Sequence, residues 1–356
     1  TLLEQKPLVR TYWESIGDLV NLFTSGEVAV AYGWLSVFTQ VKAAGVCGTD
    51  LHIWHDQFPY WPPVVLGHEF SGMVVEVGDA VTGYKPGDRV VAEPHSLACG
   101  TCELCRQGKI QICSSKRSPG WGINGAFAPY ITMPAKLLHR IPDLISFEHA
   151  ALAEPMAIAV HQVAERGKIE CQDTVVITGA GPIGILATLV AKTMGASKVI
   201  VTGTTACYQS RFEAAKYFGA DEVINAEETD VVASVMKSTN GRGADIVIET
   251  SGAGAAIAQS VELVKKCGRI SAIGINSKGN VSFPWNQAVY KVLDISFNMS
   301  SSYTSWDRAI SLIASTPKDL GRLITSRSGI SEWESVFREL ETEKGIKALF
   351  IPDEPV

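Results

Sequence analysis

The sequence predicts an α/β protein of two domains: a β-rich first domain and a second domain built on a doubly wound parallel sheet. A chain of 356 residues is longer than one compact core usually needs, which favours two domains. From about Thr174 onward, continuous apolar runs alternate with helical patterns, as in a parallel sheet covered on both faces. Before residue 150, Gly and Pro interrupt short strands, which is typical of an all-β, partly barrel-like unit. We expect the first domain at 1–157, completed by 302–356, and the second at 158–301.

The elements expected in the second domain alternate between strand and helix. Thr174 to Thr178 should be a strand, followed by a helix through Lys192. A further helix is expected at 211–218, and further strands at 198–202, 222–225, 244–250, 269–273 and 294–298. In the first domain, strands are expected within 64–78, 88–92 and 126–134. A helix near Trp306 and a strand at 348–351 end the chain and could pack back onto the first domain, whereas the first forty residues show only weak periodicity.

Composition and charge exclude several classes of protein. The residues are 46% hydrophobic and 19% charged, as in an ordinary globular protein, so disorder is excluded as the dominant state. A net charge of −6 without a basic block argues against a role on nucleic acid or on anionic membranes. The apolar stretch from Ile183 to Ala191 is too short to span a membrane, and the first residues lack the pattern of a signal peptide. We therefore expect a cytoplasmic protein.

Four cysteines are crowded into fifteen residues, and their spacing predicts a metal site. The cluster consists of Cys99, Cys102, Cys105 and Cys113. Four thiolates satisfy tetrahedral zinc and leave no open position, so this zinc should be structural. An iron–sulfur cluster is the main alternative, but the chain offers no second cysteine group. Cysteines used for a metal instead of disulfides also indicate a reducing compartment.

A second, mixed set of metal ligands is expected from Cys47, His68, Glu69 and Glu154. Three protein ligands plus an exchangeable water are typical of catalytic zinc, which can polarise an alcohol oxygen and lower its pKa. Taken singly, Cys47 could be a small buried hydrophobe and His68 a hydrogen-bonded core residue. The metal interpretation depends on the set and on the nucleotide motif that follows.

The run Gly179-Ala-Gly181-Pro182-Ile183-Gly184 directly follows the expected strand and opens a helix. The first glycine permits a tight turn, the second lets the backbone approach a pyrophosphate, and the third allows helix–strand packing. The phosphates would lie at the helix N-terminus, where free amides and the helix dipole favour anions. In this strand–turn–helix context the motif predicts a Rossmann dinucleotide-binding domain.

The end of the next strand bears on the choice of dinucleotide. Sites that prefer NAD usually carry Asp or Glu there, but this chain has Gly203, followed by Thr204 and Thr205. Together with the guanidinium of Arg211, these residues could accept a 2′-phosphate. We therefore favour NADP, with NAD as the other possibility. The alternative is that Gly203 makes a turn and Arg211 begins a solvated helix.

Together these motifs resemble the zinc-dependent medium-chain alcohol and polyol dehydrogenase family. The resemblance extends from about Val41 to Ile351 and includes Gly67-His-Glu-Phe-Ser-Gly72 and Gly87-Asp88-Arg89-Val90. It implies a GroES-like catalytic domain and two zinc ions per chain. The catalytic zinc would be bound by Cys47, His68 and Glu69, with Glu154 as a fourth or transient ligand, and the structural zinc by Cys99, Cys102, Cys105 and Cys113. Thr49 would hand the substrate proton toward the cofactor ribose, and His52 would pass it to solvent.

Within that family, the pairing of Glu69 with Glu154 is most similar to sorbitol-type polyol dehydrogenases and threonine dehydrogenases. Around 298–303 the chain departs from the polyol enzymes, which usually carry an Arg-Tyr pair there. The expected activity is oxidation of a polyol-like secondary alcohol to a ketone. The alternatives are a threonine or amino-alcohol dehydrogenase, or a catalytically silent protein that binds zinc and nucleotide. As partners we expect a small-molecule alcohol or ketone and a second copy of the chain, in a homodimer or homotetramer, with Arg269 to Val281 as an edge strand that pairs subunits.

Overall fold

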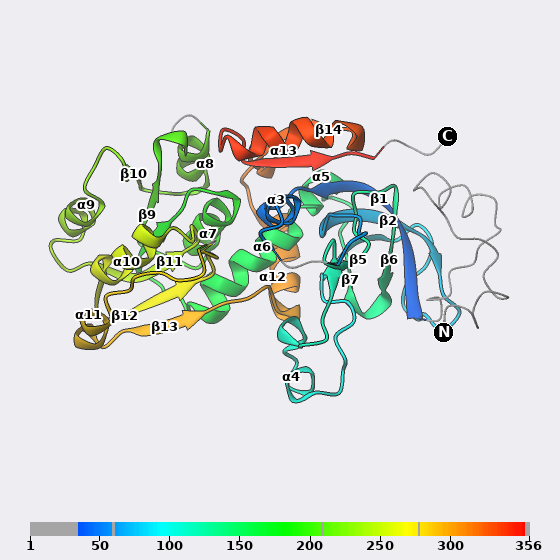
Figure 1. The fold of residues 1–356 in the computed structure, drawn as a ribbon, viewed down its shortest axis with the longest axis horizontal. Helices are drawn as coiled ribbons and strands as arrows, with labels where there is room; N and C mark the ends of the chain where they lie inside the picture. Colours follow the sequence, from blue (N-terminus) through cyan, green and yellow to red (C-terminus); the bar gives the residue numbers. More distant parts are fainter. Residues whose placement is uncertain (1–34, 59–60, 208–209, 277, 353–356) are drawn as a thin grey trace.

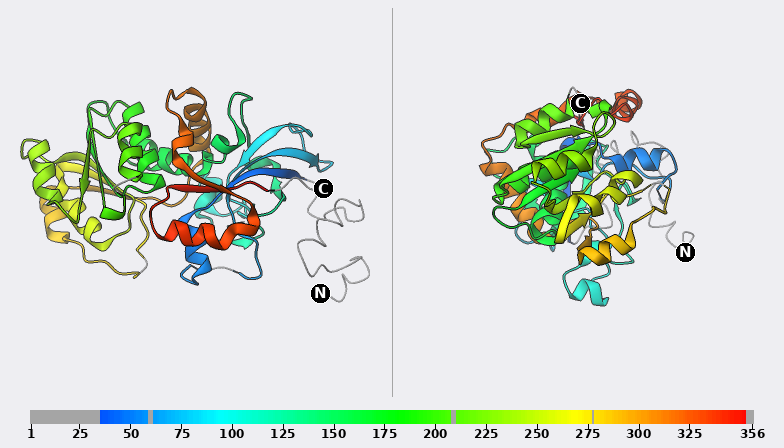
Figure 2. Two further views of the ribbon diagram at one scale, coloured as in Figure 1. Left: turned by 90° about the horizontal axis from the view of Figure 1, so that it is seen from above. Right: turned by 90° about the vertical axis from the view of Figure 1, so that its left-hand side faces the viewer.

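The computed structural model describes residues 35–58, 61–207, 210–276 and 278–352, which form two units side by side. Figure 1 shows a parallel sheet to the left, a β-rich unit to the right, and the helices α6 and α12 between them. The views in Figure 2 show the same separation of the two sheets. Our expectations for the first 34 residues lie outside the described residues.

The β-rich unit is built on a seven-stranded sheet with strand order β14-β15-β1-β2-β3-β7, and β6 pairs with β1. Along β1 (Ser36–Gly45), buried and partly exposed residues alternate, as expected of a strand with one face on the core. It pairs antiparallel with β2 (Glu69–Val77), β6 (Tyr130–Pro134) and β15 (Lys347–Phe350). The sheet continues through β3 (Arg89–Ala92) and β7 (Leu138–Arg140), while β14 (Ile324–Ser328) runs parallel to β15. Strand β15, from the C-terminal part of the chain, therefore lies beside β1, the first strand of the described residues.

The second unit is a six-stranded sheet with order β10-β9-β8-β11-β12-β13, and every neighbouring pair is parallel. Its strands are β8 (Thr174–Thr178), β9 (Lys198–Gly203), β10 (Glu222–Asn225), β11 (Ala244–Glu249), β12 (Val264–Ala272) and β13 (Asp294–Phe297). All residues of β8 and β11 are buried, because helices cover both faces. The doubly wound parallel sheet is thus confirmed.

One expectation about this sheet is wrong. The stretch Arg269 to Val281 is not an edge strand, because β12 lies between β11 and β13. The edge of the sheet is β13 instead. Apolar character near residue 270 reflects burial inside the sheet and not an exposed pairing edge.

The helix α6 (Ala153–Val160) fills the junction between the two units, and every one of its residues is buried. It continues into a π-helical segment, η4 (His161–Arg166), and packs against α7 (Pro182–Thr193) and α12 (Tyr303–Ser315). The side chain of Ser302 caps α12 by accepting a hydrogen bond from the Ser305 amide. Along α12, Trp306, Ala309, Ile310 and Ile313 are buried at helical spacing. This helix therefore fastens the two units together.

The remaining elements are short helices and strands on the periphery. In the β-rich unit these are α3 (Gly48–Trp54), α4 (Glu103–Arg106), η2 (Ile110–Ile112), β4 (Ser118–Pro119), β5 (Gly122–Ile123), η3 (Ala135–Leu137), α5 (Phe147–Ala150), η6 (Leu320–Leu323), η7 (Ile330–Glu332) and α13 (Trp333–Glu341). Around the parallel sheet lie η5 (Thr205–Cys207), α8 (Arg211–Phe218), α9 (Val231–Ser238), α10 (Gly254–Leu263) and α11 (Trp285–Lys291). Across the described ranges, no helix combines the length and apolar character that crossing a membrane requires.

Candidate active site

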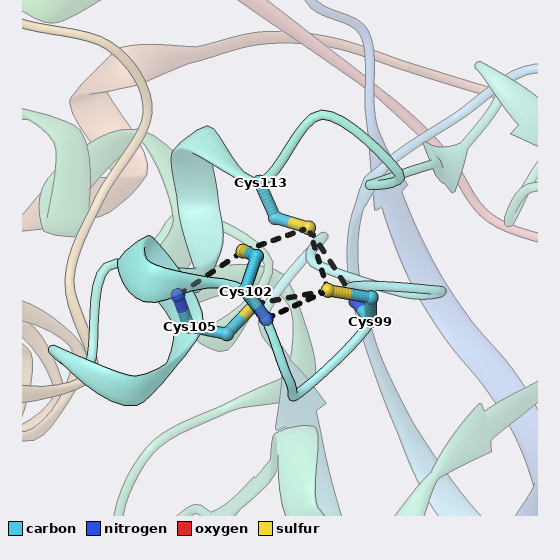
Figure 3. A group of neighbouring side chains, drawn as sticks. All are labelled: Cys99, Cys102, Cys105 and Cys113. Carbon is cyan, nitrogen blue, oxygen red and sulfur yellow. Dashed lines mark hydrogen bonds between the residues drawn. The ribbon is translucent and has the colours of Figure 1, made fainter.

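The four clustered cysteines converge in a lobe that projects from the β-rich unit around α4 (Figures 1 and 3). The sulfur atoms of Cys99, Cys102, Cys105 and Cys113 all lie within 4.8 Å of one another. Three of the sulfur–sulfur distances are 3.7 to 3.9 Å. A tetrahedron of sulfurs around zinc has edges of about 3.8 Å, because Zn–S bonds are about 2.3 Å long. The thiols therefore stand at the spacing that tetrahedral zinc requires.

Backbone amides support two of these thiols, Cys99 and Cys113, as thiolates. The Cys102 amide donates to Cys99 Sγ at 3.3 Å, and the Cys99 amide donates to Cys113 Sγ at 3.4 Å. Hydrogen bonds from Thr101 and Cys102 lower the pKa of the Cys99 thiol to about 5. Since zinc binds the thiolate form, the lobe favours the ligand state of this cysteine before any metal arrives.

A second convergence of metal-binding side chains involves Cys47, His68 and Glu69, whose donor atoms also lie within 4.8 Å of one another. Cys47 is the N-cap of α3, and the other two residues stand where β2 begins. The β1–β2 register places Gly45 opposite Glu69, so the two strands bring Cys47 toward the pair. A Cβ on Gly45 would collide with the Glu69 carboxylate, which explains the glycine. One sulfur, one imidazole nitrogen and one carboxylate form a donor set that suits zinc.

The Asp50 carboxylate holds this arrangement through contacts with Cys47, Gly67 and His68. Its side chain is fully buried and accepts hydrogen bonds from the amides of Cys47 at 2.9 Å and Gly67 at 3.2 Å. The same carboxylate lies 3.6 Å from Nδ1 of His68. A carboxylate on one ring nitrogen leaves the other, Nε2, to face a metal. Asp50 thus orients a ligand without itself belonging to the set.

Lys347 enters the site from β15, 278 residues further along the chain than Glu69. Its buried ammonium contacts both carboxylate oxygens of Glu69, at 2.9 and 2.7 Å, and donates to the Val46 carbonyl at 2.9 Å. Burial lowers the pKa of Lys347, but the charges of Glu69, Cys47 and Glu154 together outweigh burial and raise it. The ion pair therefore compensates two charges that would be costly to bury alone.

Glu154 lies near this group but outside it. The carboxylate belongs to α6 and is buried, and burial raises its pKa to about 7, while the charge of His68 lowers it. Its oxygens are not among the donor atoms within 4.8 Å of one another. The structure thus brings Cys47, His68 and Glu69 together and leaves Glu154 beside them.

The two residues expected to carry a proton lie on α3, next to the metal-binding group. Thr49 Oγ1 accepts a hydrogen bond from Cys47 Sγ at 3.7 Å. His52 is exposed, and its Nδ1 pairs with Gln57 Oε1 at 3.0 Å. One helical turn therefore separates a hydroxyl beside the metal ligands from an imidazole in contact with water.

The glycine motif lies between β8 and α7, as the sequence predicts. Gly179 has a φ of +112°, which favours glycine, and Gly181 is the N-cap of α7, with Pro182 in its first turn and Ile183 after it. A Cβ on Gly184 would collide with the Gly179 carbonyl, whereas one on Gly181 would meet no atom within 4 Å. The open space above Gly181 and the free helix amides provide the place that a pyrophosphate needs.

In the loop after β9, some contacts favour the binding of a 2′-phosphate and others oppose it. Gly203, Thr204 and Thr205 lead into η5, and the Thr205 amide donates to the carboxylate of Glu227 at 2.8 Å. Arg211 Nε donates to the Gly345 carbonyl at 3.0 Å, and its guanidinium lies 3.8 Å from Glu343. The structure therefore engages Arg211 with the C-terminal segment and places an unforeseen carboxylate at the loop.

Comparisons with known proteins agree with this geometry. The family "Alcohol dehydrogenase GroES-like domain" matches residues 35–143, and the family "Zinc-binding dehydrogenase" matches 182–315. Sorbitol dehydrogenase of Halalkalibacterium halodurans is 36% identical over 313 residues, which cover 88% of this chain and 90% of that protein. This chain belongs to the zinc-dependent medium-chain alcohol and polyol dehydrogenases.

Two further relatives indicate the range of this family. L-threonine 3-dehydrogenase of Pyrococcus abyssi is 38% identical over 322 residues, covering 88% of this chain and 90% of that one. A zinc-binding dehydrogenase from Sinorhizobium meliloti 1021, solved with NADP bound, superposes with a TM-score of 0.82 at 31% identity. The match covers 90% of this chain and 93% of that structure. The predicted fold, a GroES-like domain with a Rossmann domain, is confirmed, and so is the predicted zinc-dependent oxidoreductase of the alcohol and polyol class.

For this dehydrogenase, sequence reasoning missed two residues of the site. Asp50 lies between Thr49 and His52 and received no role from the sequence, although a carboxylate three residues after Cys47 can cap the short helix by accepting from the Cys47 amide. Lys347 gave no local signal, because only the pairing of β15 with β1 brings it to Glu69. Membership of this enzyme family also argues against the alternative of a catalytically silent protein.

Proposed function

We propose that the enzyme oxidises a secondary alcohol to a ketone at the group formed by Cys47, His68 and Glu69. The observation that carries the proposal is the convergence of these three donors beside Thr49. Glu154 would serve as a fourth or transient ligand. The lobe of Cys99, Cys102, Cys105 and Cys113 would hold a second, structural zinc, giving two ions per chain.

In this mechanism a bound zinc would supply Lewis acidity to the alcohol oxygen, and the nicotinamide ring would accept the hydride. The chain's own residues hold and move the proton. The Thr49 hydroxyl takes the proton from the substrate and passes it toward the cofactor ribose, and the exposed His52 ring exchanges it with water. Asp50 holds His68 in orientation, while Lys347 neutralises Glu69.

The test of this function is cofactor reduction with a panel of polyols and amino alcohols. Threonine belongs on the panel, because the threonine dehydrogenase relative supports an amino alcohol as the second candidate substrate. We expect Cys47→Ser to remove turnover while the melting temperature stays close to that of the native enzyme. Cys102→Ser should instead lower the melting temperature, since binding of a structural metal contributes to folding. Zinc analysis showing one ion per chain and full activity in Cys47→Ser would contradict the assignment.

For the dinucleotide we propose NADP(H) over NAD(H). Support comes from the absence of a carboxylate at Gly203 and from the hydroxyls of Thr204 and Thr205. Glu227 opposes it, because a carboxylate beside Thr205 repels a 2′-phosphate. Placing a carboxylate at Gly203 is a poor test, since a Cβ there would lie 2.8 Å from Cε1 of Phe212.

Glu227→Gln is the cleaner variant for this question. It should raise kcat/KM with NADP(H) several-fold and leave NAD(H) nearly unchanged, because it removes a repulsive charge at constant shape. Arg211→Ala should weaken the binding of NADP(H) and not that of NAD(H) if the guanidinium turns from the Gly345 carbonyl to the 2′-phosphate. A native preference for NAD(H), together with weaker NAD(H) binding in Glu227→Gln, would identify Glu227 as the ribose partner and overturn the proposal.

We also propose the division of the chain into 1–157 with 302–356 and 158–301. Pairing of β14 and β15 into the first sheet supports the return of the C-terminal segment. For assembly we propose a homodimer or homotetramer with β13 as the pairing edge. A cytoplasmic location is consistent with eight cysteines that form no disulfide in the described structure.

A further inference from the structure

Arg211, in the first turn of α8, joins the parallel-sheet unit to the turn between α13 and β15, and Figure 1 shows these elements side by side. Its Nε donates to the Gly345 carbonyl at 3.0 Å, and its Nη1 lies 3.8 Å from the carboxylate of Glu343. The side chain of Arg211 is only 12% exposed. No described residue accepts a hydrogen bond from Nη1 or Nη2. The guanidinium therefore keeps donors that a phosphate could use.

The first turn of α8 rests on the end of β9, where the loop for the adenosine part of the dinucleotide begins. A Cβ on Gly203 would stand 2.8 Å from Cε1 of Phe212, the residue after Arg211. In Rossmann domains this strand end lies beside the 2′-position of the ribose, and an arginine nearby can accommodate a 2′-phosphate. Arg211 thus stands between two anions with which it could pair, the phosphate of NADP(H) and the carboxylate of Glu343.

The turn that carries Glu343 is held in place independently of this ion pair. The Ser210 hydroxyl donates to the Lys344 carbonyl at 2.5 Å, and the Ile346 amide donates to Thr325 Oγ1 at 3.0 Å. Glu343 cannot simply follow the guanidinium toward a bound phosphate, because these bonds fix the turn that carries it. Glu343 also has a φ of +58°, a left-handed conformation that glycine or asparagine adopts at lower cost. The backbone alone would therefore favour another residue here, which points to a use for the carboxylate.

We propose that Glu343 competes with the 2′-phosphate of NADP(H) for Arg211 and thereby helps to set the choice between NADP(H) and NAD(H). The inference rests on the proposed function, because it gives Arg211 a part in binding that phosphate. NADP(H) must draw the guanidinium away from a carboxylate, which weakens its binding, whereas NAD(H) has no 2′-phosphate and leaves the ion pair intact. Unlike Glu227, which follows β10 of the parallel sheet, this determinant of specificity comes from the C-terminal segment of the other unit.

Glu343→Gln tests the proposal, because it removes the charge at nearly constant shape. The dissociation constants of NADPH and NADH are measured on the zinc-loaded native enzyme and on the variant, by fluorescence titration with no alcohol present. We expect Glu343→Gln to bind NADPH about two- to fivefold more tightly, which is the size of effect that a partly exposed ion pair has. The dissociation constant of NADH should not change.

Two further variants separate the contact with Arg211 from a general effect of charge. Glu341→Gln is the matched control, because it removes the same charge two residues earlier, from a carboxylate that pairs with His55. It should change neither dissociation constant. In a double-mutant cycle with Arg211→Met, Glu343→Gln should no longer strengthen NADPH, because the group for which the carboxylate competes is absent. An unchanged NADPH constant in Glu343→Gln, an equal change for both dinucleotides, the same gain in Glu341→Gln, or a gain that persists with Arg211→Met would each overturn the proposal.

The same measurements separate this inference from the proposed function. If the native enzyme prefers NAD(H) and Glu343→Gln still strengthens NADPH alone, the proposed dinucleotide is wrong and the role of Glu343 stands. If no alcohol is oxidised and the selective gain is present, the reaction is misassigned and the role of Glu343 again stands. If alcohols are oxidised with NADP(H) and Glu343→Gln binds NADPH as the native enzyme does, the role of Glu343 is wrong and the proposed function stands.

Discussion

At the scale of single residues, the metal-binding group depends on side chains that hold its ligands. His68 is oriented by Asp50, whose carboxylate also accepts the amides of Cys47 and Gly67. Two of the three ligands are therefore tied to one buried carboxylate. A residue that holds a metal ligand commonly has a large effect on metal affinity without contacting the metal, because it sets the angle and basicity of the ligand.

We expect Asp50→Asn to weaken zinc binding at this group by about 10- to 100-fold. The amide keeps the shape of the side chain but lacks the negative charge that stabilises the His68 ring N–H. The measurement is zinc content and turnover after dialysis against graded chelator, with the zinc of the four-cysteine lobe as the internal reference. Retention of both zinc ions at native chelator concentrations would show that Asp50 serves only to cap α3.

The sequence indicated the three converging donors but not the residues that support them, for a physical reason. Cys47, His68 and Glu69 stand in short motifs that, taken together, supply a set of donors suited to zinc. Lys347 becomes a partner of Glu69 only when β15 closes the sheet against β1.

At the scale of elements, the predicted strands of the parallel sheet agree with the structure within a few residues, because their continuous apolar runs are buried on both faces. The largest difference is the start of β12, at Val264 instead of Arg269. Lys265 and Lys266 occupy that end of the strand, where side chains reach solvent, so the apolar run that predicts the strand begins later. The apolar signal therefore marks the buried part of a strand and not its full length.

The junction between α12 and the π-helical segment η4 depends on Glu165. Its carboxylate accepts hydrogen bonds from Ser302 Oγ at 2.5 Å and Thr304 Oγ1 at 2.6 Å, and it pairs with Nδ1 of His161 at 2.7 Å. Burial raises the pKa of Glu165, but these hydrogen bonds outweigh burial and lower it to about 2. The first turn of α12 is thereby fixed to the helix that joins the two units.

We expect this carboxylate to stabilise the fold above about pH 4.5, where it is ionised both in the folded and in the unfolded chain. Its contribution should fall as the pH drops from there toward 2, because the unfolded chain takes up a proton in this range, whereas the folded chain binds it only near pH 2. Glu165→Gln should lower the free energy of unfolding by about 2 kcal/mol at pH 7 and flatten its dependence on pH in the acid range. Urea unfolding at several pH values checks this. A parallel offset at all pH values would mean that shape, and not charge, holds the junction.

At the scale of the whole molecule, one edge of the parallel sheet carries an exposed apolar surface. It lies on α11 and β13 and includes Trp285, Val289, Tyr290, Val292 and Phe297, of which Tyr290 and Phe297 are each 77% exposed. On β13, the side away from β12 pairs with no other strand of the described chain. Exposed apolar residues beside a free strand edge are typical of a surface that pairs with another copy.

A two-fold pairing across β13 would extend the parallel sheet into a second subunit and bury each Phe297 against its partner. We therefore expect the double variant Tyr290→Lys with Phe297→Lys to convert the native oligomer into a smaller species, because four like charges would meet across the two-fold axis. Leu144→Lys is the control, since Leu144 is 73% exposed and lies between β7 and α5 of the β-rich unit, outside the elements that carry this apolar surface. Sedimentation equilibrium gives the masses. If the double variant keeps the native mass, β13 is not the pairing edge, and the apolar surface over α11 must meet some other partner.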